Sequence, residues 1–421
     1  MFRRETNFSQ TPIGSIPKEW QVARLGDIAK INRESCDPSR EFPEDRFLYI
    51  DIESIEAGSG RIKEAKMIIG KNAPSRARRV IHKDDVLMST VRPYLKAFTI
   101  VANEYENEIC STGFAVLTSK EEMNPRYLMY SLFSDTFVSQ CNRIMVGGQY
   151  PALNSSQVSE IQLPIPPMSE QRGIVEVLSV VDSAIELADK VVAKTERLKK
   201  GLMKQLLTRG IGHTEYKDTP IGKTPKTWQI VRLEDVSEDF IGGGTPSTFN
   251  PEYWNGDIAW MTSAHINGRL ITKGQKYITK KGVENSATNI VPRNNLLVST
   301  RVGIGKAAIN KIDIAISQDL TGVIINEEKA LSEFLYWVLI HSERKLKALA
   351  QGSTIKGILR EELGRLHIPL PPIAEQERIC EILSTADKKL ELEMYEKTRL
   401  ERVKRGLMDL LLTGKIRVKV D

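Results

Sequence analysis

The sequence is poor in the residues that build most metal and disulfide sites. Its 421 residues include four cysteines and five histidines, and the cysteines (Cys36, Cys110, Cys141 and Cys380) lie far apart without a C-x-x-C pair. Neither residue type shows the spacing of a zinc site. We therefore predict no metal site, and we expect reduced, mostly buried thiols of an intracellular protein.

Targeting and membrane-spanning segments are also missing. The opening residues MFRRETNFSQ lack the apolar core of a signal peptide, and no run of 18 apolar residues occurs. These absences predict a cytoplasmic protein that has no membrane partner.

Segments that resemble catalytic or nucleotide-binding motifs each lack residues that the motif requires. The glycine-rich segments Gly242–Pro246 and Val302–Lys306 lack the spacing and the Lys-Ser/Thr of a phosphate loop. The carboxylates Glu44, Asp51 and Glu53 lack the lysine that would follow in a nuclease set, and the Asn/Asp-Pro-Pro-Tyr/Phe segment of adenine methyltransferases is absent. No catalytic residue is predicted, and we expect the chain to bind rather than to catalyse.

What the sequence does contain is concentrated positive charge. The net charge of the chain is only +6, but the segment Arg61–Lys96 has ten basic and three acidic residues, and Asn267–Lys311 has nine basic residues and one acidic residue. Such clustering is typical of proteins that bind a polyanion.

The sequence also contains a long internal repeat. The segment Leu163–Ile211 recurs as Ile368–Ile416, displaced by 205 positions, and TPIGSIPKEWQVARL at Thr11 recurs as TPIGKTPKTWQIVRL at Thr219, displaced by 208. A repeat of about 200 residues is a duplicated domain followed by a helix, not a solenoid.

Each copy opens with a globular part of short strands and turns. The strands predicted in the first are Phe47–Ile55, Asp85–Val91, Lys96–Val101 and Phe114–Ser119. A helical stretch follows in both copies, at Pro125–Cys141 and at Ala330–Ala350, and a glycine-containing loop then leads to a Pro-Pro pair. This order predicts an α+β (mixed α/β) domain of about 150 residues in each copy.

Each copy closes with a long helix of about 38 residues. Pro-Pro blocks its backward extension, Ser169 or the Glu-Gln pair is expected to serve the first N–H groups, and Arg209-Gly210 and Gly414-Lys415 end it. Apolar residues alternate in steps of four and three, which predicts a coiled-coil seam. The seam residues are Ile174, Leu178, Val181, Ile185, Val192, Leu202, Leu206, Ile379, Leu383, Leu390, Leu400, Leu407 and Leu411.

The simplest partner for one such seam is the other copy. We expect an antiparallel pair of helices with one globular domain at each end, related by a pseudo-twofold internal repeat. Lys199, Glu393, Lys397 and Lys404 interrupt the seam, and Met394 or Tyr395 is expected to take over the packing there. The alternative is that each helix packs on its own domain alone.

A duplex is the polyanion that fits two basic segments carried by one rod. Lysine and arginine neutralise phosphates and fix the register, and other side chains read base edges. The candidate DNA-binding residues in these segments are Arg61, Lys63, Lys66, Arg76, Arg78, Arg79, Arg92, Lys96, Arg269, Lys273, Lys276, Lys280, Arg301 and Lys306. The competing interpretation of each charge is a solvated face.

Several motifs together resemble a known family. They are P-x-x-W-x-x-x-x-L at Pro17 and Pro225, GGTPST and PEYWNGDIAW between Gly243 and Trp260, LPIPP and IPLPP each followed by EQ, and LLTRGIG and LLTGKIRV after the helices. Over essentially the whole chain these segments resemble the DNA specificity subunit of type I restriction-modification systems. The first domain departs from the pattern because it lacks the GGTPS segment.

The resemblance implies a division into a first target-recognition domain (1–164), a first conserved helix (165–211), a second target-recognition domain (212–369) and a second conserved helix with a tail (370–421). It further implies a subunit without catalytic activity that reads a bipartite, asymmetric double-stranded DNA site. The helix pair would set the spacer between the half-sites. The glycine-containing loops would add DNA contacts at Gln149, Tyr150, Ser353 and Thr354.

The same resemblance implies the partners and where the cofactors bind. The helices would dock two methyltransferase subunits, which bring S-adenosylmethionine, and restriction/translocase subunits that use ATP and magnesium would join the full complex. No cofactor is expected in this chain. Two alternatives stay open: a single-chain enzyme that modifies or cleaves DNA, and a coiled-coil scaffold whose basic faces bind acidic proteins.

Overall fold

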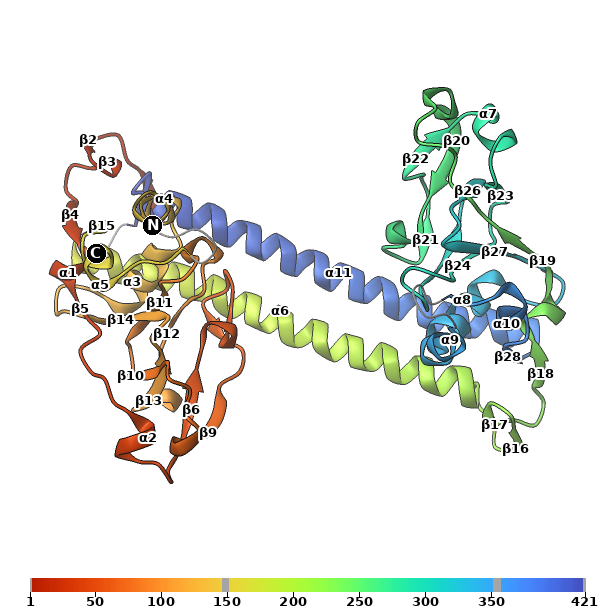
Figure 1. Ribbon diagram of the computed structural model, residues 1–421, viewed down its shortest axis with the longest axis horizontal. Helices are drawn as coiled ribbons and strands as arrows, with labels where there is room; N and C mark the ends of the chain where they lie inside the picture. Colours follow the sequence, from red (N-terminus) through yellow and green to blue (C-terminus); the bar gives the residue numbers. More distant parts are fainter. Residues whose placement is uncertain (1, 146–150, 351–356, 419–421) are drawn as a thin grey trace. The chain divides into compact units, whose positions relative to one another are not determined.

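The computed structural model describes residues 2–145, 151–350 and 357–418 and forms two compact units. The first unit contains Met1–Asp189 and Tyr395–Asp421, and the second contains Lys190–Met394. Each unit therefore combines one globular part with a segment of both long helices, α6 (Met168–Arg209) and α11 (Ile373–Leu412) (Figure 1).

Two four-stranded sheets form the globular part of the first unit. One has the order β12 (Phe98–Ile100), β11 (Val86–Ser89), β14 (Phe114–Ser119), β5 (Ala29–Ile31), and the other the order β10 (Ala77–Ile81), β13 (Glu108–Ser111), β6 (Arg46–Ile50), β9 (Lys66–Ile69). All pairs are antiparallel except β13 with β6. The strands predicted at 85–91, 96–101 and 114–119 are thus confirmed.

The central strands consist mostly of consecutive apolar residues, because both of their faces are buried. In β11, Val86 and Met88 face the core that contains α3 (Pro125–Leu132), whereas Leu87 faces a second core with Ile50 and Ile81. Two-stranded ribbons and short helices complete the unit: β1 (Phe2–Arg4) with β29 (Ile416–Val418), β2 (Phe8–Thr11) with β3 (Gly14–Pro17), β4 (Gln21–Arg24) with β15 (Gln162–Ile165), β7 (Ile55–Glu56) with β8 (Arg61–Ile62), α1 (Leu25–Ile28), α2 (Pro38–Glu41), α4 (Asp135–Ile144) and α5 (Ser155–Ser159).

The second unit repeats this plan with different lengths. Its sheets have the orders β19 (Ser237–Gly242), β27 (Leu320–Ile325), β24 (Leu296–Ser299), β25 (Ala307–Asn310), β21 (Leu270–Ile271), and β22 (Lys276–Ile278), β20 (Trp254–Met261), β26 (Ile314–Ile316), β23 (Asn289–Val291). The second unit also contains β16 (Tyr216–Thr219) with β17 (Gly222–Pro225), β18 (Gln229–Arg232) with β28 (His367–Leu370), α7 (Lys280–Glu284), α8 (Ser332–His341), α9 (Glu343–Leu349) and α10 (Arg360–Gly364).

The helical stretches predicted before the glycine loops are each divided in two. In the first unit α3 ends at Leu132, and Ser134 starts α4 by accepting a hydrogen bond from the Phe137 N–H at 3.3 Å. In the second, α8 and α9 meet at Ser342. A continuous apolar pattern did not reveal these breaks, because capping serines are also tolerated inside helices.

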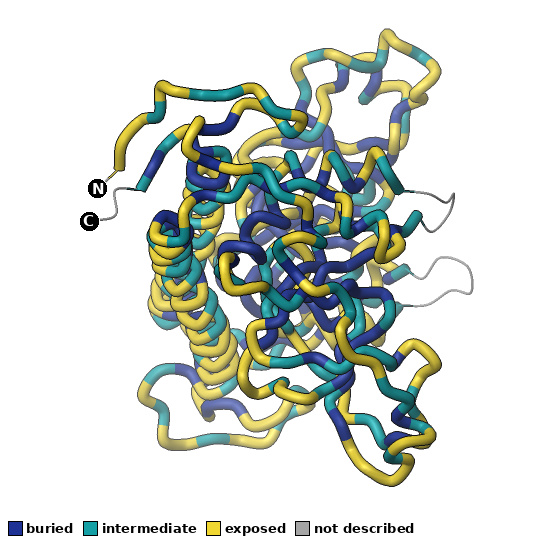
Figure 2. The backbone as a smooth tube through the Cα atoms, turned by 90° about the vertical axis from the view of Figure 1, so that its left-hand side faces the viewer, coloured by how far each residue is buried: buried dark blue, intermediate teal, exposed yellow. Residues whose placement is uncertain are grey.

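The long helices end where glycine permits a left-handed residue. Gly210 has a φ of +66° and Gly414 a φ of +69°, which is the usual conformation just past a helix C-terminus. In the tube view of Figure 2, buried residues gather in the globular parts and the helices expose much of their outer surface. All four cysteines are free thiols.

Candidate nucleic-acid interface

One tryptophan in each unit is fixed by the first turn of a long helix. The Trp20 indole donates to Glu170 of α6 at 3.0 Å, and the Trp228 indole donates to Glu375 of α11 at 2.9 Å. The tryptophans are 4% and 0% exposed. Equivalent residues of the sequence repeat therefore build the same junction twice.

The adjacent glutamines join this junction, and Glu170 and Glu375 lie in the first turns, where their charge suits the helix dipole as expected. The Gln171 side chain accepts from the Asn124 N–H and donates to the Pro166 carbonyl, and Gln376 makes the same contacts with Leu331 and Pro371. Both glutamines are buried. The Glu-Gln motif thus connects each helix start to its globular part, because its polar atoms are used by tryptophan and backbone groups elsewhere in the fold.

Within each unit the two long helices run antiparallel and are joined by ion pairs. In the first unit Lys404 pairs with Asp182 at 2.7 Å and Lys397 with Asp189 at 2.5 Å. In the second, Lys199 pairs with Asp387. The two residue numbers of every pair have the same sum, as an antiparallel register requires. The charges that interrupt the predicted seam are therefore contacts between the helices.

The predicted seam is buried or half-buried at all of its positions. Ile174, Leu178, Ile379, Leu383 and Leu411 are fully buried. Met394 and Tyr395 do not take over the packing, because they are 51% and 62% exposed. The expectation for these two residues was wrong, since Lys397 and Asp189 make the contact in this part of the first unit.

An aromatic ring lies beneath the lysine of an equivalent ion pair in each unit. The Lys404 ammonium is 5.9 Å from the Tyr130 ring centroid, and the Lys199 ammonium is 5.4 Å from that of Trp337. Tyr130 also donates to Asp182 at 2.6 Å. Both rings come from the first helix after the sheet, so each cluster holds a globular part against both long helices.

An arginine from each basic segment also binds a carboxylate of the long helices. Arg61 binds Asp189 at 2.6 Å and Glu56 at 2.9 Å, and Arg269 binds Glu333 and lies 3.7 Å from Asp387. The two arginines are separated by 208 positions, as are Trp20 and Trp228. Arg61 and Lys96 also line a cleft of about 780 Å³ that Lys404 of α11 borders. The Arg61 side chain therefore faces the long helices, whereas Lys96 binds the Phe133 carbonyl and Asp135.

The other predicted DNA-binding residues of the first unit differ in how they are held. Lys66 pairs with Asp51 at 2.5 Å, Arg78 with Asp37 at 3.0 Å and Lys96 with Asp135 at 3.2 Å. Arg79 donates to Asn32 and to the Phe114 carbonyl, and burial lowers the pKa of its guanidinium. Lys63 and Arg76 are exposed and form no ion pair within the described residues, whereas Arg92 is half-buried.

In the second unit, Lys280 pairs with Glu284 at 3.7 Å, and Lys276 lies 5.1 Å from the Trp254 ring centroid. Lys273, Arg301 and Lys306 are exposed. The predicted loop contacts Gln149, Tyr150, Ser353 and Thr354 lie outside the described residues. The exposed lysines and arginines are therefore the candidates that the fold leaves available to a polyanion.

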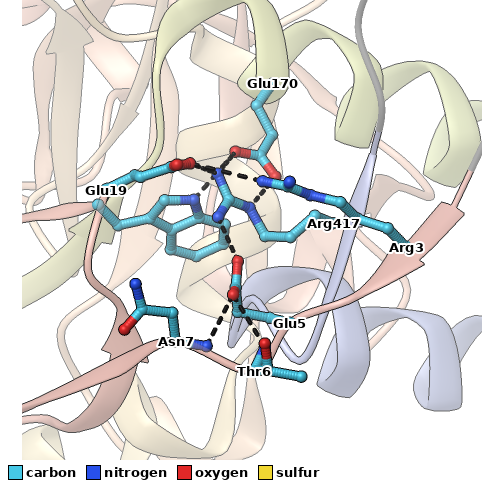
Figure 3. A network of polar contacts seen from close by, with 8 residues as sticks. Arg3, Glu5, Thr6, Asn7, Glu19, Glu170 and Arg417 are labelled. Carbon is cyan, nitrogen blue, oxygen red and sulfur yellow. Dashed lines mark hydrogen bonds and ion pairs between the residues drawn. The ribbon is translucent and has the colours of Figure 1, made fainter.

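The two ends of the chain meet in the first unit around a buried arginine (Figure 3). Strand β29 pairs antiparallel with β1, so residues 2–4 and 416–418 lie side by side. Arg417 binds Glu170 at 2.6 Å, Glu5 at 2.6 Å and Glu19 at 2.9 Å. The hydrogen bond with Glu170 is the main reason why the pKa of Arg417 is raised. This network extends the Trp20–Glu170 junction to both termini.

Sequence reasoning missed the junction residues, although the repeat contained a signal for some of them. Asp182 and Asp387, like Lys199 and Lys404, are separated by 205 positions. A charge that recurs within an apolar seam indicates a paired charge. Arg417 gave no such signal, since its partners Glu5, Glu19 and Glu170 are distant in the sequence.

Among residues 2–145, 151–350 and 357–418, none of the helices combines the length and the apolar character that a membrane span requires. The same residues contain no group of three or more His, Cys, Asp or Glu side chains that could hold a metal ion.

Comparison with known proteins agrees with the duplicated architecture. The family model described as type I restriction modification DNA specificity domain matches twice, at residues 17–197 and 225–402. The putative type I restriction enzyme MjaX specificity subunit of Methanocaldococcus jannaschii is 28% identical, with 99% of this chain and 98% of the relative aligned. The MjaVIII specificity subunit of the same organism is 26% identical over 99% and 98% of the two chains.

Solved structures show the same fold. A chain from a study of complex assembly and conformational transition of the type I R-M system has a TM-score of 0.61 at 25% identity, covering 95% of this chain and 99% of that one. The S subunit of a type I restriction-modification system from M. genitalium has a TM-score of 0.55 at 13% identity, covering 93% and 96%. The chain belongs to the type I restriction-modification DNA specificity family.

Proposed function

We propose that this chain is the DNA specificity subunit of a type I restriction-modification enzyme and reads a bipartite, asymmetric double-stranded site. The observation that carries the proposal is the repeated junction. The same Trp–Glu and Lys–Asp contacts attach two globular parts whose sequences differ. Two globular parts that differ in sequence but are attached by the same junction suit a DNA site with two different halves, one for each unit.

The exposed lysines and arginines of the two basic segments are the proposed phosphate contacts. Among them are Lys63 and Arg76 in the first unit and Lys273, Arg301 and Lys306 in the second. Each phosphate contact releases counterions, so log K should fall linearly with log salt. Arg61, Arg79 and Arg269 are proposed to position the globular parts instead, because the protein already binds their guanidinium groups.

The long helices are proposed to dock two methyltransferase subunits. Each unit exposes an equivalent pair of apolar helix residues: Leu187 and Val403 in the first, and Leu392 and Leu198 in the second, with exposed fractions between 45% and 63%. Leu187 corresponds to Leu392, and Leu198 to Val403, in the helix repeat. Two equal apolar faces suit two copies of one partner.

The chain is proposed to lack catalytic activity of its own. The methyltransferase subunits would supply S-adenosylmethionine and transfer the methyl group to adenine. Restriction/translocase subunits that use ATP and magnesium would join in the full complex. The contribution of this chain is then to select the DNA site and to hold its partners on it.

The helix pair is proposed to set the spacer between the half-sites. Inserting one heptad into α6 near Lys190 and another into α11 near Met394 lengthens both helices by roughly 10 Å. This corresponds to about three base pairs of duplex, so the methylated site should gain about three base pairs of spacer and keep both half-sites. The readout is the set of methylated sequences in cells that carry each variant.

The control carries the heptad in α6 alone. It displaces the antiparallel register and should abolish assembly, because the ion pairs and the seam no longer align in both units. An unchanged spacer in the double insertion would refute the proposal that the helix pair sets the spacer. Methylation of DNA by the purified chain alone would refute the assignment as a subunit without catalytic activity.

A further inference from the structure

A fixed loop in the second unit crosses one face of the sheet that contains β20. The Trp260 indole donates to the Gly244 carbonyl at 3.2 Å, and the Trp254 indole donates to the Ser247 carbonyl at 3.0 Å. A Cβ on Gly243 would lie 2.2 Å from the Ile316 carbonyl oxygen, so only glycine fits there. The loop conformation is therefore held at several points.

The same loop displays an aromatic side chain to solvent. Phe249 is 97% exposed, the highest value among the exposed large apolar residues of the described chain. The turn beneath it is closed by the Asn250 N–H, which donates to the Ser247 carbonyl at 3.3 Å. Phe249 contributes little to the core, yet its backbone is fixed. Such an arrangement lowers the conformational cost of binding through that ring.

Positive charge and further aromatic rings surround the base of this loop. The Lys276 ammonium lies over the Trp254 ring, Trp254 packs edge-on against Trp260 with ring centroids 5.3 Å apart, and Lys276 is the cross-strand neighbour of Trp260. Lys273, three residues before β22, is exposed as well. An exposed aromatic ring on a loop whose base carries lysines fits a nucleic acid better than an acidic protein, because bases offer stacking faces and phosphates offer charge.

We propose that Phe249 contacts the bases of the second half-site, where its ring stacks on a base or enters a base step. Apolar side chains used in this way partly unstack the duplex and make sequence-dependent deformability part of recognition. This inference rests on the proposed function and adds a specificity residue to it. The ring carries no charge, so its contribution is independent of counterion release.

The test uses the chain assembled with its methyltransferase subunits and a duplex taken from a mapped methylation site. Replacing Phe249 by alanine should weaken binding on the order of tenfold, with an unchanged slope of log K against log salt. Phe249→Trp should keep affinity within about threefold, because it preserves the stacking face. The matched control, Lys273→Ala, should lower the salt slope by about one.

A second readout locates the contact. A duplex with 2-aminopurine in the second half-site should become more fluorescent when the wild-type complex binds, and the Phe249→Ala complex should lose this increase. The probe in the first half-site should respond equally to both complexes. Because Phe249 is almost fully exposed, its replacement should leave the thermal unfolding of the chain unchanged.

Wild-type affinity in Phe249→Ala would overturn the inference and leave the proposed function standing. Loss of subunit assembly instead of DNA affinity would overturn it in favour of a protein contact. A wild-type complex without preference for any duplex would overturn both proposals.

Discussion

Replacing Asp387 by asparagine tests whether the interhelix ion pairs hold the second unit together. The Asp387 side chain is 12% exposed and the Lys199 side chain 23%, and Asp387 also faces Arg269 at 3.7 Å. Loss of the Asp387 carboxylate leaves the positive charges of Lys199 and Arg269 without this negative partner. Breaking a buried pair costs 3–5 kcal/mol, and the partial exposure of Lys199 places the expected loss at about 3 kcal/mol.

The matched control is Asp182→Asn in the first unit. Asp182 occupies the equivalent position, but its side chain is 34% exposed and the asparagine still accepts a hydrogen bond from Tyr130. The expected loss there is about 1–2 kcal/mol. A double variant, Lys199→Met with Asp387→Leu, removes both charges from the second pair and should recover much of the stability lost by Asp387→Asn.

Scanning calorimetry of the purified variants distinguishes these outcomes. For a unit of this size about 1 kcal/mol corresponds to roughly 2–4 °C, so Asp387→Asn should lower the unfolding temperature by roughly 6–12 °C. Tryptophan fluorescence can assign the transition, because Trp228, Trp254, Trp260 and Trp337 are in the second unit and Trp20 is in the first. A smaller loss for Asp387→Asn than for Asp182→Asn would contradict the argument from burial.

Two further predictions concern the first unit. Burial lowers the pKa of His82, but Glu106 and Glu34, each at 3.0 Å, outweigh it and raise the pKa above 6.5. The stabilisation from protonated His82 is therefore full below pH 6.5 and is lost as the pH rises through the folded pKa. Thermal stability should fall less between pH 6 and 8 in His82→Asn than in the wild type. Equal slopes of stability against pH in the two proteins would argue against a stabilising protonated His82. Arg417→Met leaves Glu170, of which the side chain is 5% exposed, without its cation, and should cost about 3–5 kcal/mol in urea unfolding. Arg417→Lys should lose less, and an equal loss would show that charge is irrelevant there.

The sequence predicted the repeat, the long helices and their seam because these depend on periodicity along the chain. Ile174 and Ile379 are buried where the pattern places them. The antiparallel ion pairs depend on register between segments about 200 residues apart, which periodicity does not contain. Met394 looked like a seam residue for this reason, although charged residues make the contact.

The candidate DNA-binding residues were harder to predict than the fold. A count of basic residues treats Arg61 and Lys63 alike, yet Arg61 binds a helix carboxylate and Lys63 is exposed. Only the folded arrangement separates an arginine bound within the protein from a candidate phosphate contact. The sequence did not predict a role for Phe249, because the exposure of a single aromatic residue cannot be inferred from the sequence alone.

The pairing of β1 with β29 has a consequence for biosynthesis. All of the second unit, Lys190–Met394, is one continuous segment, whereas the first unit needs residues from both ends of the chain. The ribosome therefore delivers the complete second unit while the first still lacks its α11 segment and Arg417. The part of the protein that is translated first is the last to be completed, and until then its N-terminal strand has an open edge that chaperones or a second nascent chain can reach.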